Sequence, residues 1–351
     1  MSVSALPLTY GLFEKRIDGD DALLSLAQLR FRQAGMGAEM YADTPQRLER
    51  LLEFRPSPEL PVALHLPREF NVLDSAARQR ILGFASRFAG RVRGMIVHDH
   101  LDLVDRREAC LKAVADMNTR LRRLQNAPIL FIEYAAGLEV EEFARFFSAI
   151  RDSDQICPCI DIGHVGMRQA QKAYAGMHPR KDICSLKSQP PELRSRMPDV
   201  QRAVESALPV LLSLITSIAA FGKPLHLHLH DGHPLSRFSP FGVSDHLSFL
   251  TRAPLEFEYC GCSSVPLMFG PAGLSQIVSG VLRAMGKAPA SFTLEIHPAG
   301  GRLALQEAAA LFPHWPDKTN AETMNHWLQV LSSNHALLRR AIDASRAAVA
   351  P

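Results

Sequence analysis

The sequence of 351 residues has no long hydrophobic run. No stretch approaches the roughly 18 uncharged apolar residues of a membrane span, so we expect none. The opening residues, MSVSALPLTYGLFEKR, lack the basic-then-apolar order of a secretory signal. Six cysteines are too few for a disulfide framework in a chain of this length. These absences predict a cytoplasmic protein that makes no contact with a membrane.

Neither sign of charge is in large excess. The formal net charge is +3, a thin supply for a protein that must neutralise many phosphates of a duplex. Residues 42–60 carry nearly balanced charge, and no loop near them combines Arg or Lys with an aromatic wedge. We therefore expect a small-molecule substrate, phosphorylated or not, and no nucleic-acid partner.

No Gly/Ser linker or low-complexity tract divides the chain, which predicts one domain over residues 1–351. Short apolar runs predict strands at 8–13, 38–41, 62–66, 94–97, 129–133, 156–161, 224–230 and 291–296. Helical patterns follow at 21–34, 44–54, 74–89, 105–125, 139–151, 197–221, 272–286 and 321–347. Eight strands, each followed by a helix, predict a (β/α)₈ TIM barrel. An open doubly wound sheet is the alternative, because a sequence does not reveal strand order.

Two connections are longer than a plain βα loop: residues 165–196 after the sixth strand and 232–270 after the seventh. We expect both to be long loops. From Arg168 to Arg196 there are seven Lys or Arg against two Asp or Glu. This segment is either a solvated, mobile loop or a clamp for a phosphate or carboxylate. The last helix, 321–347, is amphipathic and is expected to close the barrel, with a homodimer contact as the alternative.

Potential metal ligands stand at the carboxyl ends of six expected strands: His65, His98, Glu133, Asp161, His164, His228 and Glu295. In a barrel these ends converge on one pocket, where the active sites of this fold lie. A single histidine or glutamate at a strand end is usually structural. Seven at the same end of their strands favour a shared site. Glu39 ends the second strand, but we expect a structural role for it.

Alternation along the seventh strand places His226, His228 and His230 on one face and the leucines between them on the other. The leucines suit the surrounding helices, which puts the histidines inside the barrel. Unpaired buried imidazoles are costly, and a metal ion with carboxylate neighbours provides their partner. Mixed His and carboxylate ligands fit Zn²⁺, Mn²⁺ or Fe²⁺ better than Ca²⁺ or Mg²⁺.

The cysteines offer a competing metal site. Cys157-Pro-Cys159 and Cys260-Gly-Cys262 together would supply four thiolates. Their spacing is not the usual C-x₂-C, and the parity of the sixth strand places the first pair inside the barrel with Asp161. We therefore favour core packing for Cys157 and Cys159.

With these motifs the chain resembles, from about residue 8 to 300, the xylose-isomerase-like TIM barrels. This family includes endonuclease IV and many sugar isomerases and epimerases. The matching elements are His65-Leu66-Pro67 with Asn71, Glu133-Tyr134-Ala135-Ala136-Gly137, Asp161-Ile162-Gly163-His164, His228-Leu229-His230-Asp231, Asp245-His246 and Glu295.

The resemblance implies a divalent metal held by Glu133, Asp161, His228 and Glu295. It also implies that a second or third site of the endonuclease type is completed by His65, His98, His164 and His246, giving one to three ions. The chain departs from the family in two places. Ser244 stands where the endonuclease motif has an aspartate, and the Gly-x-Gly after His246 is absent. His233 is therefore a rival to His246.

Two reactions fit these residues. In an isomerase or epimerase, which is our first prediction, one ion chelates adjacent oxygens of a sugar or hydroxyketone while Glu133 and Glu295 exchange a proton with carbon. His164 would orient the substrate. In the alternative, two or three ions serve a hydrolase or lyase acting on a phosphoester or other small substrate. The additional histidines at 65, 98 and 246 favour this second reaction.

Overall fold

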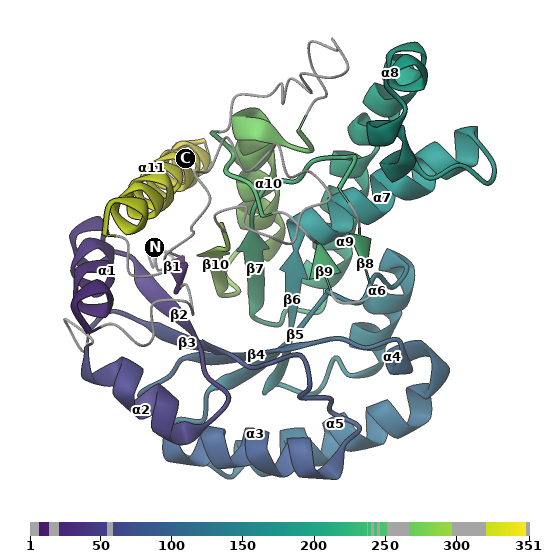
Figure 1. Ribbon diagram of the computed structural model, residues 1–351. Helices are drawn as coiled ribbons and strands as arrows, with labels where there is room; N and C mark the ends of the chain where they lie inside the picture. The colour runs from purple at the N-terminus through teal and green to yellow at the C-terminus, as the bar shows by residue number, and fades with distance from the viewer. Residues whose placement is uncertain are drawn as a thin grey trace.

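The computed structural model describes residues 7–13, 21–54, 59–236, 238–239, 242–243, 246–250, 267–296 and 321–348. Its eight parallel strands close into a barrel in the order β1-β10-β7-β6-β5-β4-β3-β2 (Figure 1). They are β1 (Leu8–Phe13), β2 (Gly37–Tyr41), β3 (Val62–His65), β4 (Gly94–His98), β5 (Ile129–Glu133), β6 (Ile156–Asp161), β7 (Leu225–Leu229) and β10 (Ala290–Leu294). The predicted (β/α)₈ TIM barrel is confirmed, and the open doubly wound alternative is wrong.

Helices surround the barrel (Figure 1). They are α1 (Asp21–Ala34), α2 (Pro45–Glu53), α3 (Ser75–Arg87), α4 (Asp102–Asp105), α5 (Arg107–Arg122), α6 (Val140–Ala149), α7 (Ile162–Met177), α8 (Pro190–Glu205), α9 (Ala207–Ala219), α10 (Gly270–Met285) and α11 (Ala321–Ala347). The expected helix 105–125 is observed as α5, with the short α4 just before it, and the expected helix 197–221 as the end of α8 followed by α9. The last helix, α11, packs on α1 and α10, and Trp327 Nε1 donates to the carbonyl of Ile296 at 2.9 Å. Its predicted role in closing the barrel is confirmed.

The connection after β6 is not the long loop that we expected. Asp161 ends the strand, and its Oδ1 also accepts a hydrogen bond from the backbone N–H of His164 at 2.8 Å, so it is the N-cap of α7. The chain continues through a 3₁₀ turn at Ile183–Ser188 into α8 (Figure 1). A residue that both ends a strand and caps a helix removes the need for a loop.

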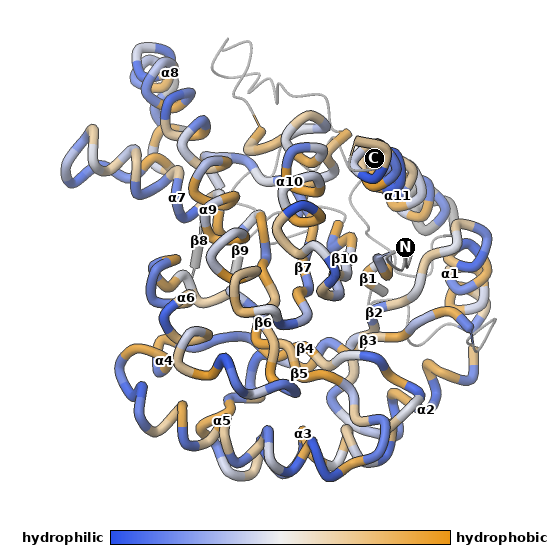
Figure 2. The backbone as a smooth tube through the Cα atoms, turned by 180° about the vertical axis from the view of Figure 1, so that it is seen from behind, coloured by the Kyte–Doolittle hydropathy of each residue, from blue (hydrophilic) through white to orange (hydrophobic). Residues whose placement is uncertain are grey.

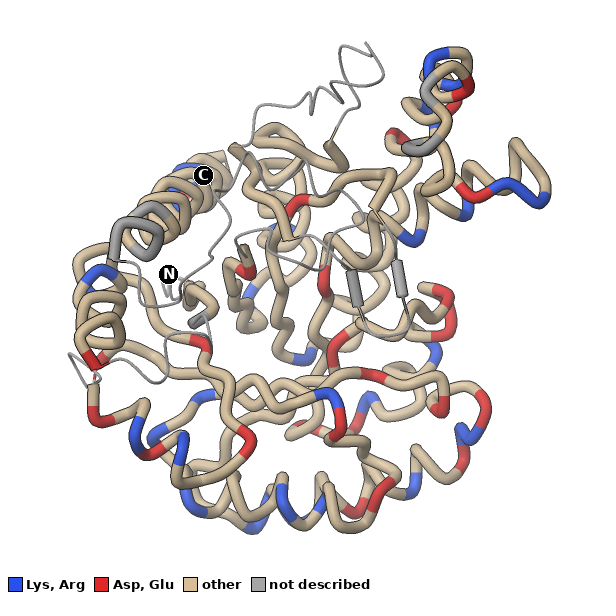
Figure 3. The backbone as a smooth tube through the Cα atoms, viewed as in Figure 1, with Lys and Arg blue, Asp and Glu red and all other residues tan. Residues whose placement is uncertain are grey.

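Several cations of this helical segment form ion pairs on the protein surface. Arg168 and Lys172 both bind Glu139, at 3.2 Å for Arg168, and Arg196 lies 3.7 Å from Asp199. Glu139 and Asp199 lie outside the stretch whose charges were counted, so the apparent excess of positive charge is partly neutralised. Only positive charges lie along α7, whereas both signs of charge are seen along α8 (Figure 3). These pairs favour the solvated surface over the phosphate clamp.

The connection after β7 is described only in part. A short antiparallel pair is formed by β8 (Phe238–Ser239) and β9 (Gly242–Val243), and Asp231 makes an isolated bridge with Leu247. Asp245, Cys260 and Cys262 lie outside the described residues, so the four-thiolate alternative stays untested.

One helical stretch, Pro191–Ala219, is long and apolar enough to cross a membrane by length and composition alone. It spans α8 and α9, and 44% of its most apolar window is buried within the structure. Helix α9 packs against α6, α7 and α10. The stretch is therefore explained by its place in the outer layer of the barrel.

Two apolar cores hold the barrel. The larger fills the space between strands and helices, and the helices alternate between polar and apolar positions along their length (Figure 2). The smaller fills the barrel interior and consists of Tyr10, Ala63, Ile96, Phe131, Cys157 and Cys159. The predicted interior position of the two cysteines is confirmed. This small core lies below a layer of polar side chains at the carboxyl ends of the strands.

Candidate metal centre

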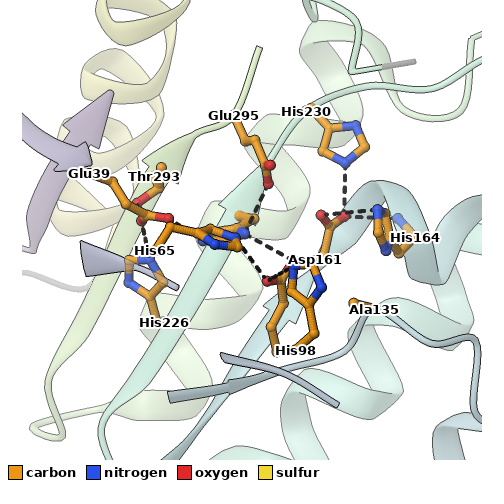
Figure 4. A network of polar contacts seen from close by, with 12 residues as sticks. Glu39, His65, His98, Ala135, Asp161, His164, His226, His230, Thr293 and Glu295 are labelled. Atoms are coloured by element: carbon orange, nitrogen blue, oxygen red, sulfur yellow. Dashed lines mark hydrogen bonds and ion pairs between the residues drawn. The ribbon is translucent and has the colours of Figure 1, made fainter. Parts of the chain in front are cut away.

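All eight residues expected to bind metal gather at the carboxyl end of the barrel. Figure 4 shows five of them there: His65, His98, Asp161, His164 and Glu295. The described residues form five overlapping sets of possible ligands, in each of which the ligand atoms lie within 4.8 Å of one another, and three of these sets contain the expected ligands at the rim of the barrel. These three sets are Glu133, Asp161, His228 and Glu295; then His65, His98 and Glu133; then Asp161, His164, His230 and His246. The first two share Glu133, and the first and third share Asp161.

The first set is centred on His228, which is fully buried. Its Nδ1 lies 3.2 Å from Glu133 Oε1 and 2.9 Å from Glu295 Oε2. Its other nitrogen, Nε2, lies 3.0 Å from Glu39 Oε1. If a metal ion displaced the proton on Nδ1 and the remaining proton stayed on Nε2 beside Glu39, the Nδ1 lone pair would face the ion together with two carboxylates. A cation at this position satisfies all three groups.

The second set uses the other oxygen of Glu133. Oε2 lies 3.3 Å from His65 Nε2 and 3.4 Å from His98 Nε2. The Nδ1 of His65 donates to the carbonyl of Leu66 at 3.0 Å, and a carbonyl only accepts, so neutral His65 presents a lone pair at Nε2. Glu133 Oε2 is buried and receives no hydrogen bond from the described residues. Two acceptors that face each other here need a shared proton or a metal ion.

Below His228 lies a further layer of polar side chains, which form hydrogen bonds with one another without a metal ion. Thr293 Oγ1 donates to Glu39 Oε2 at 2.5 Å, and His226 Nε2 lies 3.3 Å from the same oxygen. His226 Nδ1 lies 2.7 Å from Ser291 Oγ (Figure 4). Every contact in this layer pairs a donor with an acceptor. The remaining oxygen of Glu39, Oε1, faces Nε2 of His228 at 3.0 Å, so Glu39 is placed to orient this ring, as carboxylates behind metal-binding histidines are.

Without a bound cation, the electrostatics place the positive charge of the site on His228 itself. Burial by itself would raise the pKa of Glu133, but the charge of His228 and hydrogen bonds to His228 and His65 outweigh it and hold the pKa well below its usual value. Burial by itself would lower the pKa of His228, yet Cys159 and the carboxylates of Glu39 and Glu133 raise it well above its usual value. Burial lowers the pKa of His98 to about 4, so this imidazole is neutral and ready to act as a ligand.

The third set resolves the choice between His246 and His233. His246 Nε2 lies 3.6 Å from Glu295 Oε1, and the ring centroids of His246 and His230 are 4.1 Å apart. His233 is buried, its Nδ1 accepts the backbone N–H of Leu235 at 3.2 Å, and it belongs to no ligand set among the described residues. The structure thus brings His246 to the centre and leaves His233 outside it.

Neighbouring residues hold the loops around the centre. Asp99 accepts the backbone N–H groups of Ala135 and Ala136 at 2.8 and 2.5 Å, which fixes the turn after β5. Asn71, part of the matched family motif, instead donates to Asp102 at 3.0 Å and makes no described contact with the ligand sets. Tyr41 Oη lies 3.4 Å from Glu295 Oε1.

Sequence reasoning missed Glu39 and His230 as parts of the centre. Strand alternation offered a signal for Glu39, because it shares the inward face of β2 with Tyr41. His230 was recognised as inward-facing, but the sequence named no partner for it. Both partners, His228 and Asp161 respectively, come from other strands.

A separate cavity of about 1120 Å³ opens at the other end of the barrel. It is lined by Leu8, Gly94, Ile129 and Pro224, residues at the amino ends of their strands. None of the eight expected ligands lines it. Its size alone does not make it the catalytic site, because the chemistry-bearing side chains gather at the opposite end.

Comparisons with known proteins do not identify a family or a function for this chain. No family model matches the sequence, and no curated protein matches it. Among solved structures, AsfvAP:AG is 13% identical over 90% of this chain and 89% of that chain, with a TM-score of 0.46. An endo-beta-1,4-mannanase from Thermotoga petrophila is 6% identical over 96% and 77%, with a TM-score of 0.48. A pyruvate carboxylase from Rhizobium etli is 11% identical over 97% and 28%, with a TM-score of 0.37. These scores carry no argument about chemistry, so the fold assignment rests on the strand order of this chain.

Proposed function

We propose that this chain is a metal-dependent enzyme of the xylose-isomerase-like kind, with a two-ion centre that hydrolyses a small phosphoester or related substrate. One observation carries the proposal: the two oxygens of Glu133 face two different ligand sets. A carboxylate in that position could bind two ions at once, and paired ions are typical of enzymes that cleave phosphoesters.

The residues divide between the two ions. His65 and His98 with Glu133 would hold one, and Asp161, His228 and Glu295 with Glu133 the other. Nitrogen and oxygen donors in this mixture fit Zn²⁺, Mn²⁺ or Fe²⁺. When bound, such ions polarise a phosphoryl oxygen and lower the pKa of water.

The protein's own side chains supply the rest. His98 and His246 have exposed side-chain fractions of 23% and 14%, whereas those of His65, Glu133, Asp161, His164, His228 and Glu295 are 5% or less. Substrate would therefore approach along the edge that His98 and His246 form. Burial and the neighbouring Glu295 keep the pKa of Tyr41 well above its usual value, so its hydroxyl stays protonated. Tyr41 is in position to donate a hydrogen bond to a substrate oxygen beside Glu295.

An isomerase or epimerase, the first expectation from the sequence, is the second candidate. It is favoured by the set Glu133, Asp161, His228 and Glu295, which by itself suffices for one ion. In that reaction Glu133 and Glu295 would handle the proton. His65 and His98 would then bind substrate hydroxyls instead of metal.

Metal content and two substrate panels test the proposal. Protein purified without chelator is analysed for ions per chain, then assayed on phosphomonoesters and phosphodiesters and on keto-sugars. Two or more ions with phosphoester hydrolysis support the hydrolase. One ion with keto-sugar interconversion supports the isomerase, and retained metal without turnover in either panel contradicts both.

A further inference from the structure

The cavity at the amino ends of the strands occupies space that side chains fill in most barrels. The interior of a TIM barrel is ordinarily packed in layers by bulky, branched residues. At this end, however, the inward positions of β4 and β10 are held by Gly94 and Ser291, and both line the cavity. Its volume of about 1120 Å³ is at least that of known small-molecule sites, which measure roughly 300–1,000 Å³. The cavity is therefore large enough for an organic ligand.

Most of the cavity wall is apolar. Ile96 and Phe131, which belong to the smaller core inside the barrel, line its inner part, and Leu282 and Met285 near the end of α10 line its outer part. Leu8 also lines it and is 42% exposed. An apolar wall in a concave site is stabilised when a hydrocarbon group covers it. This wall therefore favours a ligand with an apolar body.

The charged residues that line the cavity are all positive. They are Arg93, Lys287 and Arg346, and no Asp or Glu lines it among the described residues. Arg93 directly precedes β4 and Lys287 lies between α10 and β10. Because β4 and β10 are opposite each other in the closed strand order, cations stand on both sides of the mouth. Arg93 and Lys287 are exposed, and neither forms an ion pair with a residue that the structure describes. A mouth of this charge favours an anion.

A polar group deeper in the cavity also lacks a partner. Tyr10 is 3% exposed and lines the cavity, yet its hydroxyl forms no hydrogen bond with the described residues. The neighbouring His226 is already engaged, because its Nε2 lies 3.3 Å from Glu39 Oε2 (Figure 4) and its Nδ1 lies 2.7 Å from Ser291 Oγ. Burial and Glu39 raise the pKa of Tyr10, with a smaller opposing effect of Arg93, so the hydroxyl stays protonated. A ligand oxygen would supply the acceptor that this donor lacks.

We propose that this cavity is a second binding site, separate from the metal centre, for a carboxylate with a hydrocarbon body. The carboxylate lies at the mouth, where the positive charges of Arg93 and Lys287 attract it. The body extends past Leu8 and Phe131 into the barrel, and an oxygen at its far end accepts a hydrogen bond from Tyr10. The site lies at the opposite end of the barrel from the proposed metal ligands, so it does not depend on the proposed function.

Isothermal titration calorimetry with three decyl compounds tests the class of ligand. Decanoate, decanol and decyltrimethylammonium share one hydrocarbon chain and differ in charge. We expect the purified protein to bind one decanoate per chain, to bind decanol about tenfold more weakly, and to bind decyltrimethylammonium more weakly still. Equal affinities for the three compounds, or no binding of decanoate, would overturn the proposal.

Variants of the exposed cations locate the carboxylate. Arg93→Gln and Lys287→Gln should each weaken decanoate binding about threefold, and the double variant about tenfold, as expected for exposed ion pairs. Arg91→Gln is the matched control, because Arg91 binds Glu49 at 2.8 Å and does not line the cavity, and it should bind decanoate as the wild type does. A double variant with wild-type affinity would show that the carboxylate is held elsewhere, for example by metal ions, and would overturn the proposal.

Two further variants test the position of the hydrocarbon body. Leu8→Trp places an indole at an exposed position of the wall, so decanoate should bind at least about tenfold more weakly. Tyr10→Phe removes only the hydroxyl, and it is compared with the wild type on octanoate, decanoate and dodecanoate with and without a terminal hydroxyl. At least one hydroxy acid should bind the wild type about threefold more tightly than its parent acid, and Tyr10→Phe should lose this gain. Unchanged affinity in Leu8→Trp, or no gain at any chain length, would overturn the placement of the body inside the barrel.

Discussion

Glu133 is the residue on which the chemistry depends, because its two oxygens face separate groups of ligands. We expect Glu133→Gln to lower turnover at least about a hundredfold, since a neutral amide does not bridge two cations. The fold should survive, because the ion pairs of this side chain with described residues are all with other members of the centre. Steady-state kinetics and circular dichroism measure both effects. Activity close to that of the wild type would show that Glu133 is not a shared ligand.

Glu39 lies beneath the proposed metal centre, where its Oε1 faces Nε2 of His228 at 3.0 Å and is placed to orient this ring. Glu39→Gln should weaken zinc binding about 10–100-fold, the usual effect of removing a carboxylate behind a metal-binding histidine. Thr293→Val is the matched control, because Thr293 contacts Glu39 and His226 but no expected ligand. It should cause a smaller loss. Competition with a chromogenic chelator measures the affinity, and equal affinities in Glu39→Gln and wild type would refute the positioning role.

At the scale of residues, the sequence predicted the expected metal ligands better than the residues that contact and position those ligands. The expected ligands were found because most of them end strands, and the fold makes those ends converge. Glu39 and His230 were not placed in the centre because their roles depend on contacts across the barrel. Local spacing carries no information about such contacts.

Asp231 links two elements beside the centre. Its carboxylate accepts the backbone N–H groups of Gly232, Phe269 and Gly270, at 2.9, 3.1 and 2.7 Å, and so ties the end of β7 to the start of α10. Asp231→Ala should lower the free energy of unfolding by about 2–4 kcal/mol, because three buried donors lose their acceptor. Asp231→Asn keeps one oxygen and should cost less. Urea denaturation compares the variants, and equal stability of all three proteins would refute the link.

Helix α11 is tied to β1 through His335, whose Nε2 lies 2.9 Å from Thr9 Oγ1. Burial, with a smaller effect of Arg339, lowers the pKa of His335 to about 4. In the unfolded chain His335 therefore binds a proton near pH 6.5, whereas in the folded chain it stays neutral until the pH falls to about 4. Stability should fall by up to about 1.4 kcal/mol per pH unit as the pH drops from about 6.5 to 4, with no contribution from His335 above that range. His335→Gln should flatten this part of the curve, and an unchanged slope in denaturation midpoints would contradict the assignment.

At the scale of elements, all eight strands could be predicted because parallel strands buried on both faces form continuous apolar runs. Their observed ends lie within two residues of the predicted ones. The segment 165–196 was predicted wrongly as a loop. Asp161 both ends β6 and caps α7, so no loop residues separate the strand from the helix. The charge count was also misleading, because the acidic partners of Arg168 and Arg196 lie outside the segment that contains these cations.

At the scale of the whole molecule, bound metal should stabilise the fold. The ligands come from strands around the barrel, so ions bind the folded chain and not the unfolded one. With free zinc at a thousand times its Kd, each site should add about 4 kcal/mol to the free energy of unfolding. Thermal melts with zinc and with chelator measure the shift. Identical melting temperatures under both conditions would mean that no ion binds this arrangement.

Closure of the barrel could not be read from the sequence, because pairing of β1 with β10 joins the two ends of the strand series. Once closed, the sheet brings the carboxyl ends of all eight strands around one axis. This geometry turns residues scattered from His65 to Glu295 into one centre.

The central claim is that Glu133 bridges two ions, and anomalous diffraction from a crystal of protein purified without chelator tests it most directly. Data collected at the absorption edge of the bound metal should give two or more peaks, with one on each side of the Glu133 carboxylate. A single peak, or peaks remote from Glu133, would contradict the account.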